Sequence, residues 1–311
     1  MALTLASGAK GLSEIEFRER FGSEDQCRSA IAAMRWRDGF SCPSCDHKGH
    51  AFLKKRGHWQ CNRCKHQVSV TAGTIFHSTK LPLTVWFLAI YHLSQSKGGI
   101  SSVELGRRLG VRQGTAWNLK QKLMQAMLLR EATKPKLDGR VEIDDAYLGG
   151  ERSGKRGRGA AGKTPFVAAV ETTADKKPRR LRLKVVKGFR KQEIAKLAKA
   201  NITAGTKVES DALSCWSAVT EAGCEHSSIK TGSGKKAASL APFKWVNTTL
   251  GNIKTALAGT YHHVSAKHAQ RYLTSFAWRF NRRYALDTMT ERLAWACAHN
   301  PPFPYRVIVN G

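Results

Sequence analysis

Two short cysteine pairs constrain the fold of this chain more than any other feature. Cys42-Pro-Ser-Cys45 and Cys61-Asn-Arg-Cys64 are separated by residues 46–60, a spacing within the range of zinc ribbons. Two such turns on facing hairpins would place four thiolates at the corners of a tetrahedron, which suits Zn²⁺. We therefore predict a closed, structural zinc site. The alternative is four free or disulfide-paired cysteines, which the paired spacing disfavours.

The charge of the chain points to a polyanionic partner. Its 311 residues include 52 Lys plus Arg and 23 Asp plus Glu, a formal net charge of +29. Such an excess favours association with nucleic acid. Hydrophobic residues make up 41% of the sequence, which is enough for packed cores and excludes a disordered basic tail. The length suggests about two domains.

The sequence gives no sign of membrane insertion or export. The longest apolar stretch, Leu81 to Leu93, is too short to cross a bilayer. The N-terminal residues lack a basic segment followed by a hydrophobic one, so no secretory signal is expected. We expect a cytoplasmic protein, whose cysteines are thiols or metal ligands rather than disulfides.

Patterning along the chain divides it into four segments. Residues 1–39 are expected to form short helices, because Ser13 with Glu16 and Ser23 with Gln26 have capping-box spacing. Residues 40–69 form the predicted ribbon, 70–130 a helical DNA-binding domain, and 135–311 a larger domain. The ribbon is basic at Lys54, Lys55, Arg56, Arg63 and Lys65. That face would contact phosphates, or it is simply solvated.

A helix-turn-helix is expected within residues 101–127. Ser101 with Glu104 is a capping box, and Gly110 marks a turn before a second helix. That helix would present five polar residues at or near its N-terminal end, where such helices meet base edges: Arg112, Gln113, Thr115, Asn118 and Lys120. The alternative is a plain helical hairpin, and the net charge favours DNA binding over it.

The second half reads as a mixed α/β (α+β) domain. Strands are expected at 140–148, 165–171 and 181–186, followed by a helix at 191–202 and a strand at 206–210. This order predicts a mixed sheet covered by flanking helices.

Three acidic residues lie at the ends of predicted strands, although the chain as a whole is strongly basic. Asp144 and Asp145 end the first strand, and Asp211 ends the fourth. Strand alternation would send Asp144 and Asp145 to opposite faces, so only one of them would belong to a given site. Two carboxylates brought together would bind a pair of Mg²⁺ ions, which can activate water against a phosphodiester. From spacing alone, turn capping or pairing with arginines is slightly favoured.

Longer motifs favour metal binding over turn capping or arginine pairing. The stretch Val141-Glu-Ile-Asp144-Asp-Ala-Tyr-Leu-Gly-Gly150 resembles the first catalytic strand of the zinc-ribbon transposases of bacterial insertion sequences, the ISXO and Merlin-like family. Similar matches follow around Asp211, in Trp245-Val-Asn247-Thr-Thr-Leu-Gly-Asn-Ile-Lys254 and in Phe276-Ala-Trp-Arg-Phe-Asn-Arg-Arg283. The resemblance also covers the ribbon and the helix-turn-helix, and so nearly the whole chain.

The resemblance implies a ribonuclease-H-like domain that cleaves DNA and transfers strands with two Mg²⁺ ions. Asp144 and Asp211 would be its metal-binding carboxylates. Asn247 stands at the third position, where an acid is common, and Lys254 follows it. Seven residues separate Asn247 from Lys254, close to two helical turns, so both would project from one helix face. Asn247 is alternatively, or in addition, a helix N-cap.

The resemblance also implies partners and a location. These are the terminal inverted repeats of an insertion sequence, target DNA, and at least one further copy of the chain, in a bacterial nucleoid. The rival interpretations are a zinc-ribbon transcriptional regulator without catalysis and a basic structural or RNA-associated protein. A pure DNA binder has no use for acids that repel phosphate, so Asp144 and Asp211 discriminate between these classes.

Overall fold

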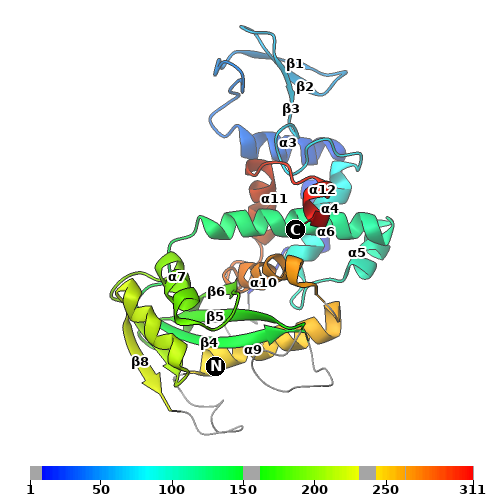
Figure 1. Ribbon diagram of the computed structural model, residues 1–311. Helices are drawn as coiled ribbons and strands as arrows, with labels where there is room; N and C mark the ends of the chain where they lie inside the picture. The colour runs from blue at the N-terminus through cyan, green and yellow to red at the C-terminus, as the bar shows by residue number, and fades with distance from the viewer. Residues whose placement is uncertain (1–8, 150–161, 231–242, 263, 311) are drawn as a thin grey trace. The chain divides into compact units, whose positions relative to one another are not determined.

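The computed structural model describes residues 9–149, 162–230, 243–262 and 264–310. They form two compact units (Figure 1). The helical unit comprises Ala9–Ser96, Ser102–Leu129 and Ala285–Gly311, and the sheet unit comprises Lys97–Ser101 and Arg130–Tyr284. Among the described helices, none has the length and apolarity that a membrane span requires.

The helical unit begins with the two short helices that the sequence predicts. Helix α2 spans Glu14–Phe21 and α3 spans Glu24–Arg35. Both carry complete capping boxes: the side chains of Ser13 and Ser23 accept from the N–H groups three residues on, and the side chains of Glu16 and Gln26 bond back. Each box satisfies two helix-end donors, which is why the chain starts its helices at these positions.

A three-stranded antiparallel sheet follows α3. Its strands are β1 (His50–Leu53), β2 (His58–Cys61) and β3 (Gln67–Ser69), in the order β1-β2-β3. Its small core consists of Phe40, Cys42, Cys61 and Val68, with Trp36 and Trp59 packed against them. A core of this size is too small to hold a sheet by burial alone, which is where a metal is needed.

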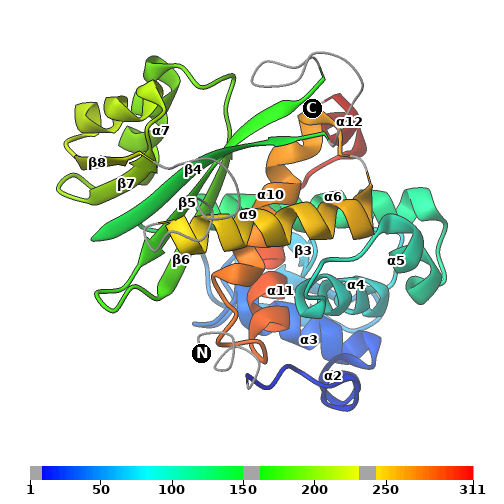
Figure 2. The same ribbon diagram turned by 90° about the horizontal axis from the view of Figure 1, so that it is seen from below.

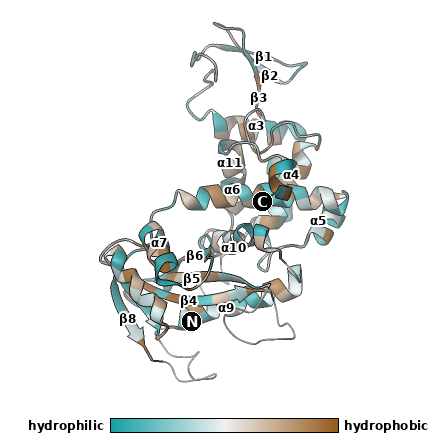
Figure 3. Ribbon diagram, in the orientation of Figure 1, coloured by the Kyte–Doolittle hydropathy of each residue, from teal (hydrophilic) through white to brown (hydrophobic). Residues whose placement is uncertain are grey.

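Hydrophobic helices build the rest of the helical unit. Helix α4 (Leu83–Gln95) is buried along most of its length and carries hydrophobic residues throughout (Figure 3). Helix α11 (Met289–His299) packs against α3 and α4, and the short α12 (Tyr305–Asn310) follows it. A hydrogen bond of 3.1 Å joins the hydroxyls of Ser94 and Thr290.

This packing differs from the expected domain boundary. We expected residues 135–311 to form one domain, whereas Ala285–Gly311 group with the N-terminal helices. The reason is that α11 buries residues such as Leu293 and Cys297 among helices from the first third of the chain. Local sequence patterns do not reveal such a long-range contact.

Two helices joined by a tight turn stand where a helix-turn-helix is expected. Helix α5 spans Ser102–Leu109 and α6 spans Gln113–Ala132, with Gly110 at φ +65° between them. Gly106 lies where α5 meets the turn: a Cβ there would come within 2.9 Å of the Val111 carbonyl oxygen. The close approach therefore depends on a glycine.

The sheet unit is built on five strands in the order β6-β5-β4-β7-β8. Strand β4 pairs antiparallel with β5, and β5 with β6, whereas β4 pairs parallel with β7, and β7 with β8. This is a ribonuclease-H-like mixed sheet with its first strand in the centre. The strands are β4 (Arg140–Leu148), β5 (Thr164–Thr172), β6 (Pro178–Val185), β7 (Lys207–Asp211) and β8 (Glu225–Ile229).

Helices cover both faces of this sheet (Figure 2). On one face, Val141 and Ile143 of β4 pack with α7 (Lys191–Asn201) and the 3₁₀ segment η1 (Ser214–Ala222). On the other, Ala146 and Leu148 pack with α9 (Lys244–Ala256) and α10 (Ala266–Phe280). The alternation along β4 therefore decides which side chains meet α9.

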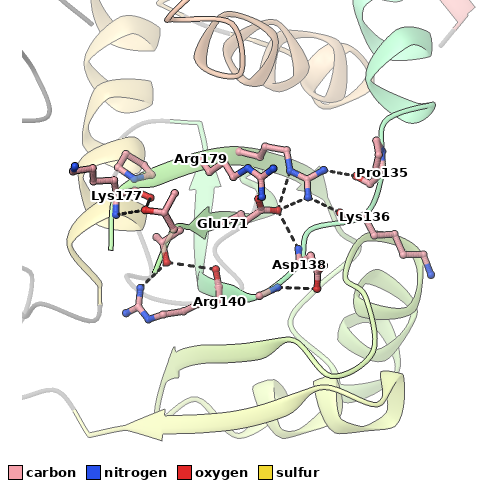
Figure 4. A network of polar contacts seen from close by, with 12 residues as sticks. Pro135, Lys136, Asp138, Arg140, Glu171, Lys177 and Arg179 are labelled. Carbon is pink, nitrogen blue, oxygen red and sulfur yellow. Dashed lines mark hydrogen bonds and ion pairs between the residues drawn. The ribbon is translucent and has the colours of Figure 1, made fainter. Parts of the chain in front are cut away.

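A buried carboxylate ties β5 and β6 to the segment that leads into β4 (Figure 4). Glu171 is almost fully buried and pairs with Arg180 and Arg179. It also accepts from the backbone N–H of Asp138 at 3.0 Å. Because a buried charge is tolerated only when it is paired and hydrogen-bonded, this cluster fixes the start of β4 relative to β5.

The turn between α5 and α6 yields a stability prediction. Gly106→Ala should lower the free energy of unfolding by about 1–3 kcal/mol, because the new methyl group meets backbone that cannot move freely. Urea unfolding measures the change. Gly114→Ala is the matched control, since nothing lies within 4 Å of a Cβ there, and it should stabilise α6 by about 0.5–1 kcal/mol. Equal effects of the two substitutions would contradict the close approach at Gly106.

Candidate functional site

The acidic residues singled out in the sequence lie on neighbouring central strands. Strands β4 and β7 are parallel, and Val141 pairs with Val208 and Glu142 with Glu209. Two residues further along the same register, Asp144 stands opposite Asp211. Asp144 also shares its sheet face with Ala146 and Leu148, the face that α9 covers.

Three carboxylates meet at this point. Asp144, Asp145 and Asp211 each offer an oxygen, and these three oxygens lie within 4.8 Å of one another. The structure thus brings Asp144 and Asp211 together. It also corrects the expectation that only one of Asp144 and Asp145 would belong to the site. The β4–β7 ladder ends at Glu142 and Glu209, so both carboxylates of β4 can reach past the last pair toward Asp211.

The cluster favours a proton on Asp144. Burial raises the pKa of this carboxyl to about 7, and the negative charges of Asp145 and Asp211 act in the same direction. The backbone N–H of Asp145, which donates to Asp144 Oδ1 at 2.8 Å, and the Lys254 ammonium oppose the shift. A group in this state gains most from a bound divalent cation, which would replace the proton.

The carboxylate of Asp211 is held in one orientation. The indole N–H of the fully buried Trp216 donates to its Oδ1 at 2.9 Å, and the backbone N–H of Leu213 donates to the same oxygen at 3.0 Å. Both donors come from the turn and 3₁₀ segment that follow β7. Such fixed partners pre-orient an acidic ligand without demanding reorganisation when a cation binds.

A buried glutamate anchors α9 to strand β4. The backbone N–H groups of Trp245 and Val246 donate to Glu142 Oε2 at 2.9 and 3.0 Å. Glu142 is fully buried and pairs with Arg140 at 3.2 Å. Burial raises the pKa of Glu142, and the Val246 and Trp245 N–H groups and Arg140 counteract this. The first turn of α9 is thereby fixed beside Glu142, which lies two residues before Asp144 on β4.

Asn247 and Lys254 both lie on α9. Asn247 is half-buried and stands inside the helix, so it is not the N-cap, which is Phe243. Lys254 is exposed, and its positive charge acts on the pKa of Asp144. Beyond Ala256 the helix widens into a π-helical segment, η3 (Leu257–Tyr261), of which no residue is buried.

The four cysteines of the ribbon form a second cluster. The Sγ atoms of Cys42, Cys45, Cys61 and Cys64 lie within 4.8 Å of one another. Cys42 and Cys64 are 3.5 Å apart at sulfur, and Cys45 and Cys61 are 3.6 Å apart. Four sulfurs at such separations can surround a tetrahedral ion with Zn–S bonds of about 2.3 Å.

The two cysteine turns repeat one backbone geometry. Asp46 and Lys65 follow the second cysteine of each turn, both with positive φ, at 56° and 59°. Their N–H groups donate to the carbonyls of Cys42 and Cys61 at 2.9 and 3.1 Å. Burial raises the pKa of Cys61, but the N–H groups of Cys64 and Arg63 lower it, and the net result is a pKa of about 7. A thiol of this kind ionises readily for a metal.

The expected DNA-contacting residues of α6 divide into two groups. Arg112 and Gln113 are exposed, and Thr115 and Asn118 are half-buried. Lys120 is fully buried and cannot reach DNA in this conformation. It lies one turn after the buried Ala116, on the packed face of the helix, which the spacing of four residues already implies.

Comparisons with known families agree with this arrangement. Residues 136–281 match the ISXO2-like transposase domain, and residues 22–67 match the transposase zinc-ribbon domain. The chain contains an ISXO2-like transposase domain preceded by a transposase zinc ribbon. The transposase domain contains all of the sheet's strands, the three aspartates and α9, and the zinc-ribbon match contains all four cysteines.

One curated relative of this chain is an uncharacterised protein in transposable element ISH50 of Halobacterium salinarum. The two are 29% identical over 141 residues, which is 44% of this chain and 45% of the relative. The chain thus spans about half the length of that protein.

Solved structures with some likeness include a simian T-cell lymphotropic virus intasome and a pre-cleavage Mos1 transpososome. Sequence identities are 11% and 10%, and TM-scores are 0.31 and 0.28. The matches cover 70% of this chain in both cases, and 74% and 79% of the other chains. Since both scores are low, the ribonuclease-H-like arrangement rests on sheet order and strand direction.

The ribbon generates a prediction about metal content. The wild-type chain should retain about one zinc ion, and Cys42→Ala should lose it, because three thiolates no longer enclose the ion. Metal analysis of the purified proteins measures this. Cys27→Ala is the control, since Cys27 is a buried thiol of α3 that donates to the Phe21 carbonyl. Zinc retained in the Cys42 variant would argue against the four-thiolate site.

The acidic cluster generates a prediction about pH. In the folded protein the pKa of Asp144 is about 7, against an ordinary 3.8, so its contribution to stability is present below pH 3.8 and is lost as the pH rises to 7. Asp144→Asn should therefore stabilise the metal-free protein by about 1–3 kcal/mol at pH 8, and by little at pH 4. Urea unfolding across this range gives the difference.

Adding Mg²⁺ should reverse the ranking at pH 8, because wild type gains more from the cation than the variant does. Asp175→Asn, which removes an exposed carboxylate paired with Lys177, should show neither effect. A pH-independent gain for Asp144→Asn would contradict the proton on this residue.

Proposed function

We propose that this protein is the DNA transposase of an insertion sequence. It would bind the terminal inverted repeats of its element and hydrolyse a phosphodiester at each end. Each freed 3′-hydroxyl would then attack a phosphodiester of the target DNA, which joins the element to the target and releases a 3′-hydroxyl of the target strand. One observation carries the proposal: three carboxylate oxygens gather within 4.8 Å, beside a helix bearing Lys254, in a chain with a net charge of +29.

The donor set fits divalent metal ions. Asp144, Asp145 and Asp211 offer hard oxygen ligands, and burial together with the neighbouring carboxylates raises the pKa of Asp144, a shift that a bound cation would oppose. We assign Asp144 and Asp211 as the main Mg²⁺ ligands, with Asn247 as an uncharged third. Two bound Mg²⁺ ions would supply activation of the attacking water and stabilisation of the leaving oxygen.

The chain's own residues prepare the site around the DNA backbone. Trp216 fixes the Asp211 carboxylate, and Glu142 fixes the first turn of α9. Lys254 is exposed, so its ammonium is available to a phosphate near Asp144. These residues would position the DNA backbone so that in-line attack on its phosphodiester needs little rearrangement.

The helical unit would supply recognition of the element ends. The basic ribbon would contribute phosphate contacts, and the start of α6, with Arg112 and Gln113 exposed, would meet base edges. Because two ends are joined in one event, we expect a dimer or larger assembly on DNA. The site of action would be the bacterial nucleoid in the cytoplasm.

A zinc-ribbon regulator without catalysis is the weaker interpretation. Clustered carboxylates repel phosphate, so they would reduce the affinity of a protein that only binds DNA.

Cleavage of end-containing DNA tests the proposal. With Mg²⁺, the protein should nick DNA that carries the element's inverted repeats, and Asp144→Asn or Asp211→Asn should reduce nicking by about a hundredfold or more, because the metal ligands are lost. Gel analysis of nicked product measures the rate, and a mobility shift measures binding, which should persist.

Asp175→Asn serves as the control for removing a carboxylate and should cleave at the wild-type rate. Nicking that survives in both site variants would exclude the assigned cluster. Binding without any nicking by wild type, with Mg²⁺ and correct ends, would favour the regulator.

A further inference from the structure

A hollow lies between the ribbon and α3 in the helical unit. Its volume is about 740 Å³, within the about 300–1,000 Å³ range of small-molecule sites. One wall is a single face of α3, formed by Asp25, Arg28, Ser29 and Ala32, which follow helical spacing. The other wall is the β1–β2 hairpin, with Phe52, Trp59 and its turn at 54–57. Figure 1 shows α3 next to the ribbon strands.

Contacts outside the hollow hold its two walls together. The guanidinium of Arg35, at the end of α3, donates to the carbonyls of Ser69 and Val70 at 3.1 and 2.6 Å. At the hairpin turn, Arg28 Nη1 lies 2.9 Å from where a Cβ on Gly57 would stand. The hollow is therefore a feature of the folded unit rather than a gap between independent segments.

The hollow is strongly basic. Four cationic residues line it, Arg28, Lys54, Lys55 and Arg56, against one acid, Asp25. Arg28 lies 4.0 Å from the Glu24 carboxylate, whereas within the described residues Lys54 and Lys55 form no ion pair, and Arg56 bonds the neutral side chain of Gln67 at 3.3 Å. Uncompensated cations around a concavity attract a phosphate group.

An aromatic surface lies among these cations. Phe52 pairs across the strands with Trp59, and their ring centroids are 4.6 Å apart. Trp59 in turn contacts Trp36, with 4.9 Å between the ring centroids. Phe52 remains 43% exposed at the end of this row. An exposed ring backed by packed rings and flanked by cations combines stacking with phosphate binding, the two elements of single-strand recognition.

We propose that this hollow binds a nucleotide whose base is unpaired, stacked on Phe52, with its phosphates held by Lys54, Lys55 and Arg28. A duplex keeps its bases inside the helix and is read by convex elements that enter its grooves. A concave site with an aromatic wall instead suits a base that is not stacked within a duplex. The site lies in the helical unit and goes beyond the proposed cleavage function. Its test uses binding alone, so its failure would leave that function untouched.

Binding of labelled oligothymidine by the full-length zinc-loaded protein tests the proposal. At about 0.15 M salt, Phe52→Ala should weaken binding about tenfold, whereas Phe52→Trp should retain it, because only the ring is required. Affinity for a blunt-ended duplex should change less than twofold. An oligonucleotide carrying iodouracil should photocross-link to Phe52 or Trp59 on irradiation.

Charge is tested with matched pairs. The double variant Lys54→Ala, Lys55→Ala should lower the slope of log affinity against log salt concentration for oligothymidine. The decrease should correspond to the loss of about two phosphate contacts. Lys48→Ala with Arg63→Ala removes two cations from the ribbon outside the hollow and should have a smaller effect. Zinc content confirms that each variant is folded. Unchanged oligothymidine affinity in Phe52→Ala, equal loss for single strand and duplex, or cross-links only elsewhere would overturn the proposal.

Discussion

Three carboxylates cannot remain charged side by side without a compensating cation, and the sheet unit is organised around this constraint. The centre of the sheet brings Asp144, Asp145 and Asp211 together, and buried partners hold their surroundings in place. Repulsion of this kind destabilises the metal-free fold, so rigid supports are needed to keep the acids in place. Trp216 and Glu142 provide such supports from elements on opposite faces of the sheet.

The helical unit meets a different constraint, since its ribbon has almost no hydrophobic core. Two turns with identical hydrogen bonding bring four thiols together, and the few aromatic residues pack beside them. Metal binding there takes the place of burial as the source of stability. The absence of a large core also leaves Phe52 uncovered, and it is this ring that we propose as a platform for a base.

Much of this could be predicted from the sequence, because the deciding signals are local. Paired cysteines, capping boxes and strand alternation indicated the ribbon, the short N-terminal helices and the bounds of β4. Long-range contacts could not be predicted. Asp145 joins the cluster although strand alternation separates it from Asp144, and residues 285–310 join the helical unit because α11 packs on α3 and α4. The prediction that Lys120 contacts DNA could have been avoided, since its spacing of four residues from Ala116 already places it on the packed face of α6.

Helix α9 is held at both ends. Its first turn is bonded to Glu142, and beyond its last turn Leu257 packs against the sheet core and the Tyr261 ring of η3 contacts Tyr272 of α10. A rod held at two points cannot tilt without breaking one of these contacts. Asn247 and Lys254, which lie between the two points, therefore keep a constant position relative to the acids of β4.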